Sequence, residues 1–455
     1  MSANLEKLIT GQRDFFSSSR TKDIGFRIEQ LKTLEKAIKA NEKNILEALK
    51  RDLSKPEFES YAPEIGFVLN EIKYASKNVL RWSKAERVRT PLLQFPASSY
   101  IYSESLGNVL IIGPWNYPFQ LIMAPLVGSI AAGNCSILKP SEFAPASSKL
   151  IARLVEQNFD PGYLSAVEGG SDIAKKLLEH KFDHIFFTGS ADTGRLVYSA
   201  AAKNLTPITL ELGGKSPCIV DKNINIEYSA KRIIWGKFFN AGQTCIAPDY
   251  LLAHSSVKKM LLDSMAEYVK KFYEKTPGDY AGIINQAHFE RLSGLLEGNI
   301  VVGGKTNISN LYISPTIITD VSWEDKIMQN EIFGPILPVL EYINLDEAIA
   351  KINKNPKPLA IYIFSNDKEV QDKILRGTSS GGVCINDCLS HISSEHLPFG
   401  GIGGSGIGNY HGKFSFDTFS HKKSVMKKSF RLDIPLRYPP YSQAALRLLK
   451  KIYPL

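Results

Sequence analysis

Cysteine is scarce in this sequence, with five residues among 455, and these five are scattered along the chain. An odd number at irregular spacing excludes a disulfide framework and favours a reducing compartment such as the cytosol. Cys384 and Cys388 have no companion pair and no histidine at zinc-finger spacing, so no metal is expected. The patterns HExxH, GxSxG and GxxxxGK followed by Ser or Thr are also absent, which leaves zinc-protease, serine-hydrolase and P-loop chemistry without support.

Long apolar runs are missing as well. The longest, residues 117–134, contains Gln120, two prolines and two glycines, and it is short for a bilayer span. A buried helix is therefore the expected structure of this stretch. The first residues carry acidic side chains early and lack the apolar core of a signal peptide, so a cytoplasmic location is expected.

Positive charge is concentrated at one end of the chain. The net charge is +9, but residues 421–455 hold nine Lys or Arg and a single acid, Asp433, so this segment carries +8 and the first 420 residues about +1. A basic tail on a nearly neutral body indicates a membrane surface or an acidic partner, and it argues against nucleic acid binding.

Apolar strands and helices alternate along the chain. Residues 20–51 and 56–83 show helical spacing, and residues 90–104 are expected to be extended. Four apolar strands, each followed by a helix, come next, at Asn108–Ile112, Cys135–Lys139, 164–167 and 184–187. This alternation predicts a parallel sheet covered on both faces, with ligands bound at the carboxyl ends of its strands.

A second α/β series is expected from about Thr209. Its strands are expected at 218–220, 338–340, Ala360–Phe364 and 382–386, and its helices at 226–239, 256–273, Leu345–Asn353 and 368–376. Two such units in one chain predict a cleft between them. The fold class is therefore α/β, with two doubly wound domains.

The segment FFNAGQTCIAPDY, residues 238–250, places Cys245 after a Gly-Gln turn. A nucleophilic thiol needs partial exposure and help in ionising, often from a nearby cation or a helix N-terminus. Taken alone, Cys245 fits a small buried hydrophobe equally well.

Two carboxylates stand in motifs that could face the cleft. Glu211 ends the apolar strand of TLELGGKSP, residues 209–217, where it could act as a general base. Glu331 precedes an aromatic residue and a Gly-Pro turn in NEIFGPILPV, residues 330–339. In isolation each is also compatible with a solvated acid.

Three further motifs follow predicted strands. FFTGSADTG, residues 186–194, runs from a strand through Gly189 and Ser190 into a helix that contains Gly194, a geometry that suits a phosphate. In ILKPSE, residues 137–142, Lys139 and Glu142 could reach a ribose. In IIGPWNYPFQL, residues 111–121, the amide of Asn116 could donate to a developing oxyanion, although turn-forming Asn is common.

Together and in this order, these motifs and LPFGGIGGSGIGNYHGKFSFDTFSH, residues 397–421, resemble the aldehyde dehydrogenase superfamily. The resemblance covers the chain to about Pro440. The segments YHGKFSFDTFSH and RYPP are similar to the class 3 branch, which includes fatty aldehyde dehydrogenases.

The resemblance implies the roles of particular residues. It makes Cys245 the nucleophile, Asn116 and the backbone N–H of Cys245 the oxyanion hole, and Glu211 the general base. It assigns Glu331 to the nicotinamide ribose, with a possible share in the base role. It assigns cofactor contacts to Gly189, Ser190, Gly194, Lys139, Glu142, Trp115 and Phe333. The implied reaction oxidises an aldehyde through a thiohemiacetal and a thioester on the cysteine, with NAD or NADP accepting the hydride.

The resemblance also implies a domain plan. Residues 1–83 and 106–208 would bind NAD(P), residues 209–395 would form the catalytic domain, and residues 84–105 and 396–432 would form bridging strands. Strands near residues 90–104 and 408–420 would then mediate a homodimer. In the tail, residues 433–455, a short basic amphipathic helix is expected where membrane-bound relatives carry a hydrophobic anchor. Its apolar face would hold Ala445, Leu448, Leu449 and Ile452, and it could lie on an anionic membrane or cover the substrate entrance.

The favoured function is oxidation of medium- to long-chain aliphatic or aromatic aldehydes. A coenzyme-A-acylating or semialdehyde-specific relative shares the fold, but the presence of both Glu211 and Glu331 favours hydrolysis of the thioester. A catalytically silent binding protein would be expected to lack the nucleophile or the base, and this sequence has both.

Overall fold

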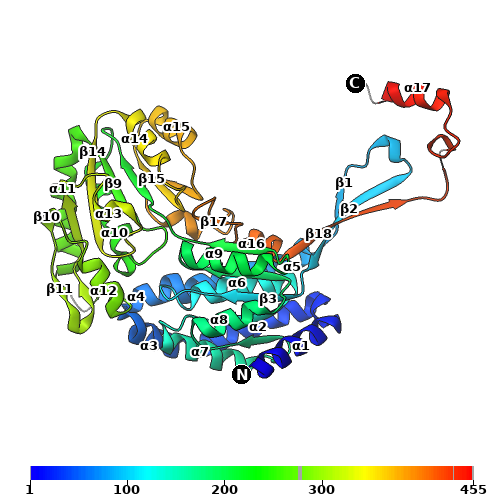
Figure 1. Ribbon diagram of the computed structural model, residues 1–455, viewed down its shortest axis with the longest axis horizontal. Helices are drawn as coiled ribbons and strands as arrows, with labels where there is room; N and C mark the ends of the chain where they lie inside the picture. The colour runs from blue at the N-terminus through cyan, green and yellow to red at the C-terminus, as the bar shows by residue number, and fades with distance from the viewer. Residues whose placement is uncertain (1, 275–278, 434, 453–455) are drawn as a thin grey trace.

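A computed structural model describes residues 2–274, 279–433 and 435–452. It contains two large, mainly parallel sheets, each flanked by helices, and a narrow antiparallel arm that projects from them (Figure 1). The α/β class with two doubly wound units, predicted from the alternation of strands and helices, is confirmed.

The first sheet has the strand order β17-β7-β6-β3-β4-β5. Its strands are β3 (Asn108–Ile112), β4 (Cys135–Lys139), β5 (Leu164–Ala166), β6 (His184–Thr188), β7 (Ile208–Glu211) and β17 (Gly406–Ile407), of which β17 alone is antiparallel to its neighbour. The chain leaves β3 toward β4 and β5 and later returns to the other side of β3 as β6. A crevice for a ligand is therefore expected at the carboxyl ends of β3 and β6.

Alternate residues of these strands face two separate layers of helices. Leu110 and Ile112 pack in a cluster with residues of α1 (Ser2–Ser17), α8 (Ser171–Glu179) and α9 (Ala191–Ala202). Val109 and Ile111 belong to the other cluster, with residues of α2 (Ile24–Ala40), α3 (Glu42–Leu53), α5 (Phe67–Trp82), α6 (Gln120–Ala132) and α7 (Pro145–Asn158). Because successive side chains of a strand point to opposite faces, a continuous apolar run fills both layers.

Helix α6 is buried along its whole length. It confirms the prediction of a buried helix from the long apolar stretch. Across the described part of the chain, no helix has the length and apolarity needed to cross a membrane.

The expected long helices at the N-terminus are interrupted. Asn41 separates α2 from α3, and its side-chain amide donates to the carbonyl of Ala37, which competes with the regular helix pattern. The stretch 56–83 comprises α4 (Glu57–Ser60), the π-helical turn η2 (Tyr61–Gly66) and α5. Pro63 lies in that turn and has no N–H to donate, so a regular α-helix cannot run through it.

The second sheet has the order β10-β13-β14-β9-β8-β15-β16, parallel except for β10. Its strands are β8 (Pro217–Val220), β9 (Tyr250–His254), β10 (Asn299–Val302), β13 (Thr316–Thr319), β14 (Ile336–Tyr342), β15 (Ala360–Phe364) and β16 (Gly382–Ile385). Its helices are α10 (Ile226–Phe238), α11 (Ser255–Val269), α12 (Gln286–Ser293), α13 (Lys326–Gln329), α14 (Leu345–Asn353) and α15 (Lys368–Gly377), and β11 (Thr306–Asn307) and β12 (Tyr312–Ile313) form a small hairpin.

Two boundaries differ from the expectation. Strand β7, expected to open the second unit, pairs in parallel with β6, so the first sheet extends to Glu211. Residues 408–420, expected as a strand, contain the helix α16 (Gly412–Thr418), because Ser415 and Phe416 at neighbouring positions are buried in contact with the body.

The arm is a three-stranded antiparallel sheet of β1 (Glu86–Val88), β2 (Ala97–Ser105) and β18 (Ser420–Lys428). Figure 1 shows it extending away from both large sheets, with α17 (Gln443–Ile452) beyond its end. The helix expected in the tail is thus present. The predicted apolar position Ile452 has a side chain outside the described set.

Candidate active site

Cys245 lies in the connection between the helical turn η4 (Phe239–Gly242) and β9. Asn240, Ala241 and Gly242 have φ angles of 52°, 52° and 70°, so three consecutive residues adopt the left-handed conformation. Outside glycine this conformation costs roughly 1 kcal/mol or more per residue, and it persists only where the surroundings enforce it. The loop before the cysteine is therefore shaped by its contacts.

Gln243 supplies several of these contacts from a fully buried position. Its Nε2 donates to the carbonyls of Asn240 at 3.2 Å and Gly282 at 2.9 Å, and its Oε1 accepts from the N–H of Ile284 at 3.1 Å. On the far side of the cysteine, the Tyr362 hydroxyl donates to the carbonyl of Ile246. Cys245 is thus held from both sides.

The Cys245 thiol is half-buried, and its pKa is raised above the usual value. Desolvation is the main cause, and the nearby carboxyls of Glu331 and Glu211 add to it, while the backbone N–H groups of Cys245 and Ile246 oppose it. The thiol therefore needs a base or an added positive charge to become a nucleophile.

Asn116 follows β3 in the turn that leads to α6, and it is buried. Its Nδ2 donates to the carbonyl of Gln243 at 3.0 Å, two residues before the cysteine. The next residue repeats the connection, because the Tyr117 hydroxyl lies 2.7 Å from Oγ1 of Thr244. An amide carries two donors, and this bond uses one of them.

Glu211 ends β7 and is almost fully buried, and neither carboxyl oxygen has a hydrogen-bond partner among the described residues. Burial raises its pKa well above the ordinary value for glutamate. An unpartnered buried carboxyl is costly to the fold, and such groups concentrate at functional sites.

Glu331 lies between α13 and β14. Burial raises its pKa to about 8, the charge of Asp249 adds to this, and the N–H of Gly214 with Lys215 and Lys237 oppose it. Gly213 leaves room for this side chain, because a Cβ at that position would overlap the Glu331 carboxylate where it now lies. The structure therefore brings together Cys245, Asn116, Glu211 and Glu331, which stand far apart in the sequence.

Lys215 and Asp249 hold the Glu331 loop, and the sequence reasoning missed both. Lys215 Nζ donates to Asp249 and to the carbonyls of Ile327 at 3.0 Å and Asn330 at 2.9 Å. Asp249 accepts from the N–H of Ile332 at 2.8 Å. A sequence signal for both was available, because Lys215 lies in the motif ELGGKSP and Asp249 in the motif FFNAGQTCIAPDY.

The predicted phosphate loop lies at the start of α9. Ser190 caps this helix by accepting from the N–H of Thr193 at 3.3 Å. A Cβ on Gly189 would overlap the ring of Phe187, and one on Gly194 would press into Leu212. The loop thus follows β6 at the crevice edge of the sheet, where helical N–H groups favour an anion.

Lys139 ends β4, one strand away from the same crevice. Its Nζ donates to Glu142 and to the carbonyl of Pro140, both at 2.9 Å. The rings of Trp115 and Phe333 meet edge to face at 5.3 Å, and His288 lies 5.0 Å from Trp115. The structure thus places the cofactor residues predicted from the sequence in a helix cap, a strand-end Lys–Glu pair and an aromatic corner.

Among residues 2–274, 279–433 and 435–452, no group of three His, Cys, Asp or Glu side chains could hold a metal ion. Cys384 and Cys388 are free cysteines.

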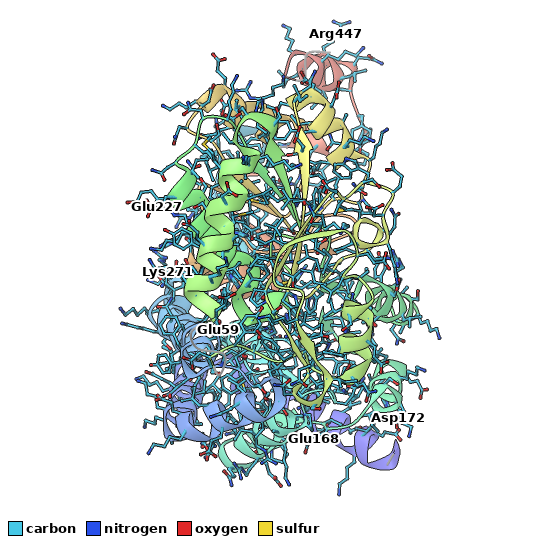
Figure 2. The ribbon with its side chains drawn as sticks, turned by 90° about the vertical axis from the view of Figure 1, so that its left-hand side faces the viewer. Glu59, Glu168, Asp172, Glu227, Lys271 and Arg447 are labelled. Carbon is cyan, nitrogen blue, oxygen red and sulfur yellow. The ribbon has the colours of Figure 1, made fainter. Side chains whose placement is uncertain are left out.

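A second set of residues escaped the sequence reasoning entirely. Lys55, Glu59 and Glu64, in and around α4 and η2, are buried and contact the loops of Asn116 and Cys245. In Figure 2, Glu59 lies where the N-terminal helices meet the second unit. Charged residues in a helical stretch predict solvent exposure, so no local signal marked them.

Comparison with known proteins identifies the family to which this chain belongs. A sequence model described as the Aldehyde dehydrogenase family matches residues 2–425. The chain is 50% identical over 444 residues to 4,4'-diaponeurosporen-aldehyde dehydrogenase of Staphylococcus aureus, covering 96% of each protein. It is 46% identical to aldehyde dehydrogenase family 3 member A2 of Macaca fascicularis, covering 97% of this chain and 92% of that protein.

Solved structures agree with the sequence comparison. A substrate-bound state of Staphylococcus aureus AldH superimposes with a TM-score of 0.96 at 48% identity, covering 98% of this chain and 99% of the other. An NAD-dependent aldehyde dehydrogenase of Sinorhizobium meliloti gives a TM-score of 0.86 at 26% identity, with 95% and 88% covered. The predicted resemblance is confirmed: the chain belongs to the aldehyde dehydrogenase family, and its relatives include the family 3 enzymes.

Proposed function

We propose that this aldehyde dehydrogenase oxidises medium- to long-chain aliphatic or aromatic aldehydes to carboxylic acids through a covalent adduct on Cys245. One observation carries the proposal: the loop of the half-buried Cys245 thiol accepts a hydrogen bond from the Asn116 amide, and the buried carboxyl of Glu211 and the half-buried carboxyl of Glu331 lie near the thiol. One relative is named for an aldehyde, 4,4'-diaponeurosporen-aldehyde.

The first chemical step is addition of the Cys245 sulfur to the aldehyde carbon. The thiol proton leaves to a nearby base, a C–S bond forms, and the carbonyl oxygen becomes an oxyanion. Nδ2 of Asn116 and the N–H of Cys245 are the donors for that oxygen. A single oxyanion donor is typically worth roughly 10²–10³ in rate, so Asn116 is a large contributor.

A bound nicotinamide cofactor supplies the hydride acceptor for the oxidation. Gly189, Ser190 and Gly194 would hold its phosphates, and Lys139 and Glu142 a ribose. Glu331, Trp115 and Phe333 would hold the nicotinamide end. The charge of Glu142 would repel a 2′-phosphate, so NAD is the favoured cofactor and NADP the alternative, which parallel assays with both nucleotides would distinguish.

Release of the acid requires water to attack the thioester on Cys245. A carboxylate accepts a proton from that water, the C–S bond breaks, and the thiol is regenerated. Both Glu211 and Glu331 lie close enough to Cys245 to raise its pKa, so both are candidates for this base.

The direct test is nicotinamide reduction with hexanal by the wild type and by Cys245→Ala. Loss of turnover is expected, and Cys384→Ala, which removes another half-buried thiol, serves as the matched control. Turnover that is unchanged in Cys245→Ala would refute the mechanism. Aldehydes of increasing chain length would then test the proposed substrate range.

We also infer that the C-terminal tail contacts an anionic membrane surface. Helix α17 carries the exposed cations Arg447, Lys450 and Lys451, and its Leu448 and Leu449 are about half exposed. Figure 2 shows Arg447 at the far end of the molecule from Glu168 and Asp172. A short helix with cations and exposed leucines suits the interface of an anionic bilayer.

Sedimentation with anionic vesicles tests this inference. The full chain is expected to bind and to be released by salt, whereas a chain truncated after residue 435 is expected to stay in solution. Equal binding of both would contradict it and favour a tail that covers the substrate entrance.

We also propose that the chain forms a homodimer through the three-stranded arm. Strand β2 pairs with β18 along nine residues, and this sheet stands clear of the body in Figure 1. Sedimentation velocity would test the oligomeric state, and a monomer would contradict this assignment.

A further inference from the structure

A completely buried ion pair lies behind the proposed oxyanion hole. Lys55 Nζ and Glu64 Oε1 are 2.6 Å apart, and neither side chain is exposed. Removing two charges from water costs several kcal/mol per ion, so a pair of this kind is weak support for stability. The hydrogen bonds that Lys55 and Glu64 make to neighbouring backbone groups indicate a second role for the pair.

The pair holds the turn that carries Asn116 at both of its ends. Lys55 Nζ donates to the backbone carbonyl of Asn116 at 3.0 Å and lies 4.1 Å from the ring centre of Tyr117. Glu64 Oε2 accepts from the N–H groups of Phe119 at 3.0 Å and Gln120 at 3.1 Å, where α6 begins. The carboxylate therefore also meets the positive end of that helix.

The same segment fixes the turn against the cysteine loop. The Asn116 carbonyl accepts a second bond from Nδ2 of Asn240 at 3.0 Å, and the Asn240 N–H donates to Glu59 at 2.8 Å. One stretch of chain, residues 55–64, thus contacts both the oxyanion donor and the loop of the nucleophile. The relative position of Asn116 and Cys245 depends on it.

We propose that Lys55 and Glu64 are positioning residues for Asn116, an inference that rests on the proposed oxyanion role of Asn116. With its carbonyl held by Lys55 and by Asn240, the Asn116 backbone has one orientation, and its side-chain amide points at the cysteine loop. An oxyanion donor acts only within about 2.7–3.1 Å of the developing charge. A misplacement of about 1 Å can cost on the order of 10² in rate, so this anchoring is worth a large factor in acylation.

The test replaces both charges together, because a single replacement leaves the other charge buried and unpaired. In Lys55→Met/Glu64→Gln, single-turnover acylation with hexanal is expected to fall about 10- to 10²-fold while the KM stays within a factor of three. The variant Lys55→Leu/Glu64→Met offers an apolar alternative if the first does not fold.

Combination with Asn116→Ala separates positioning from general support. If the pair acts through the Asn116 amide, the triple variant has the same acylation rate as Asn116→Ala alone. If the triple variant loses acylation rate by the product of the two separate losses, the proposal is overturned. It is also overturned if Lys55→Met/Glu64→Gln acylates at the wild-type rate. If Asn116→Ala itself acylates normally, the oxyanion role fails and the positioning role fails with it.

Arg27→Met is the matched control. Arg27 is a buried cation that donates to the backbone carbonyls of Thr21 at 2.7 Å and Ala131 at 3.3 Å, away from Asn116. The Arg27→Met substitution is expected to lower the midpoint of urea unfolding without changing the acylation rate. A fall in acylation equal to that of the pair variant would show that loss of stability alone explains both, against the proposal.

Discussion

The pH dependence of turnover can identify the base that hydrolyses the thioester. Glu331 has a pKa of about 8, because burial and Asp249 disfavour its charged form more than the Gly214 N–H and two lysines favour it. A carboxyl with a raised pKa holds its proton below that value and becomes a base above it. From pH 7 to pH 9 the ionised fraction of such a group rises from about one tenth to about nine tenths.

Turnover limited by a Glu331 base should therefore increase about tenfold over this interval and then level off. Burial also raises the pKa of Glu211 well above its ordinary value, and neither of its oxygens has a hydrogen-bond partner among the described residues, so variants of each glutamate must show which carboxyl the curve follows. Catalytic groups act best with a pKa near the working pH, which favours Glu331.

The assay measures kcat with hexanal between pH 6.5 and 9.5 at constant ionic strength, for the wild type, Glu331→Gln and Glu211→Gln. Glutamine keeps the size of the side chain and an oxygen that can accept from Gly214. Glu331→Gln is expected to lose the rise near pH 8 and to accumulate an acyl adduct on Cys245, detectable by intact mass. A wild-type pH curve in Glu331→Gln, with no adduct, would refute this reasoning.

Three further changes test other parts of the site and the fold. Asn116→Ala removes one oxyanion donor and should lower kcat about 10²- to 10³-fold with little change in urea unfolding. A smaller loss would show that the oxyanion is bound by other donors. Gly213→Ala should lower kcat about 10²-fold in steady-state assays, because the new Cβ would displace the Glu331 carboxylate, and normal turnover would show that Glu331 can move without cost. Leu252→Ala, at a position almost completely buried in β9, should lower the free energy of unfolding by about 2–5 kcal/mol in urea titrations, and a loss below 1 kcal/mol would indicate a core that collapses around the cavity.

Strands that are buried on both faces were the best-predicted part of the fold. Asn108–Ile112 and Cys135–Lys139 have the predicted bounds because an apolar run ended by Gly or Pro has few alternative structures. Strand β9 was missed, since Tyr250 follows Pro248 and Asp249, which mark a turn. The break at Asn41 was missed because a single half-buried polar residue does not disturb a helical pattern.

Some residues of the candidate site could likewise be predicted from the sequence, and others could not. Cys245, Glu211, Asn116 and Glu331 stand at turns next to strands, so motifs could single them out. Lys55 precedes a helical stretch and Glu64 lies inside it, and both become notable only when folding brings them to the turn of Asn116, 61 residues away from Lys55. Local sequence carries no sign of such a contact.

Conformational strain explains why the motif residues depend on distant ones. Asn240, Ala241 and Gly242 all take positive φ, which an isolated segment would not retain. Glu59 on the N-terminal helices and Gly282 and Ile284 beyond α11 supply bonds that keep this loop in place. Because these partners come from the N-terminal helices and from the second unit, a change that separates the two sheets would move Cys245 relative to Asn116. The geometry of the nucleophile is therefore a property of the packed domain interface, and substitutions there should affect acylation before they affect the binding of substrate.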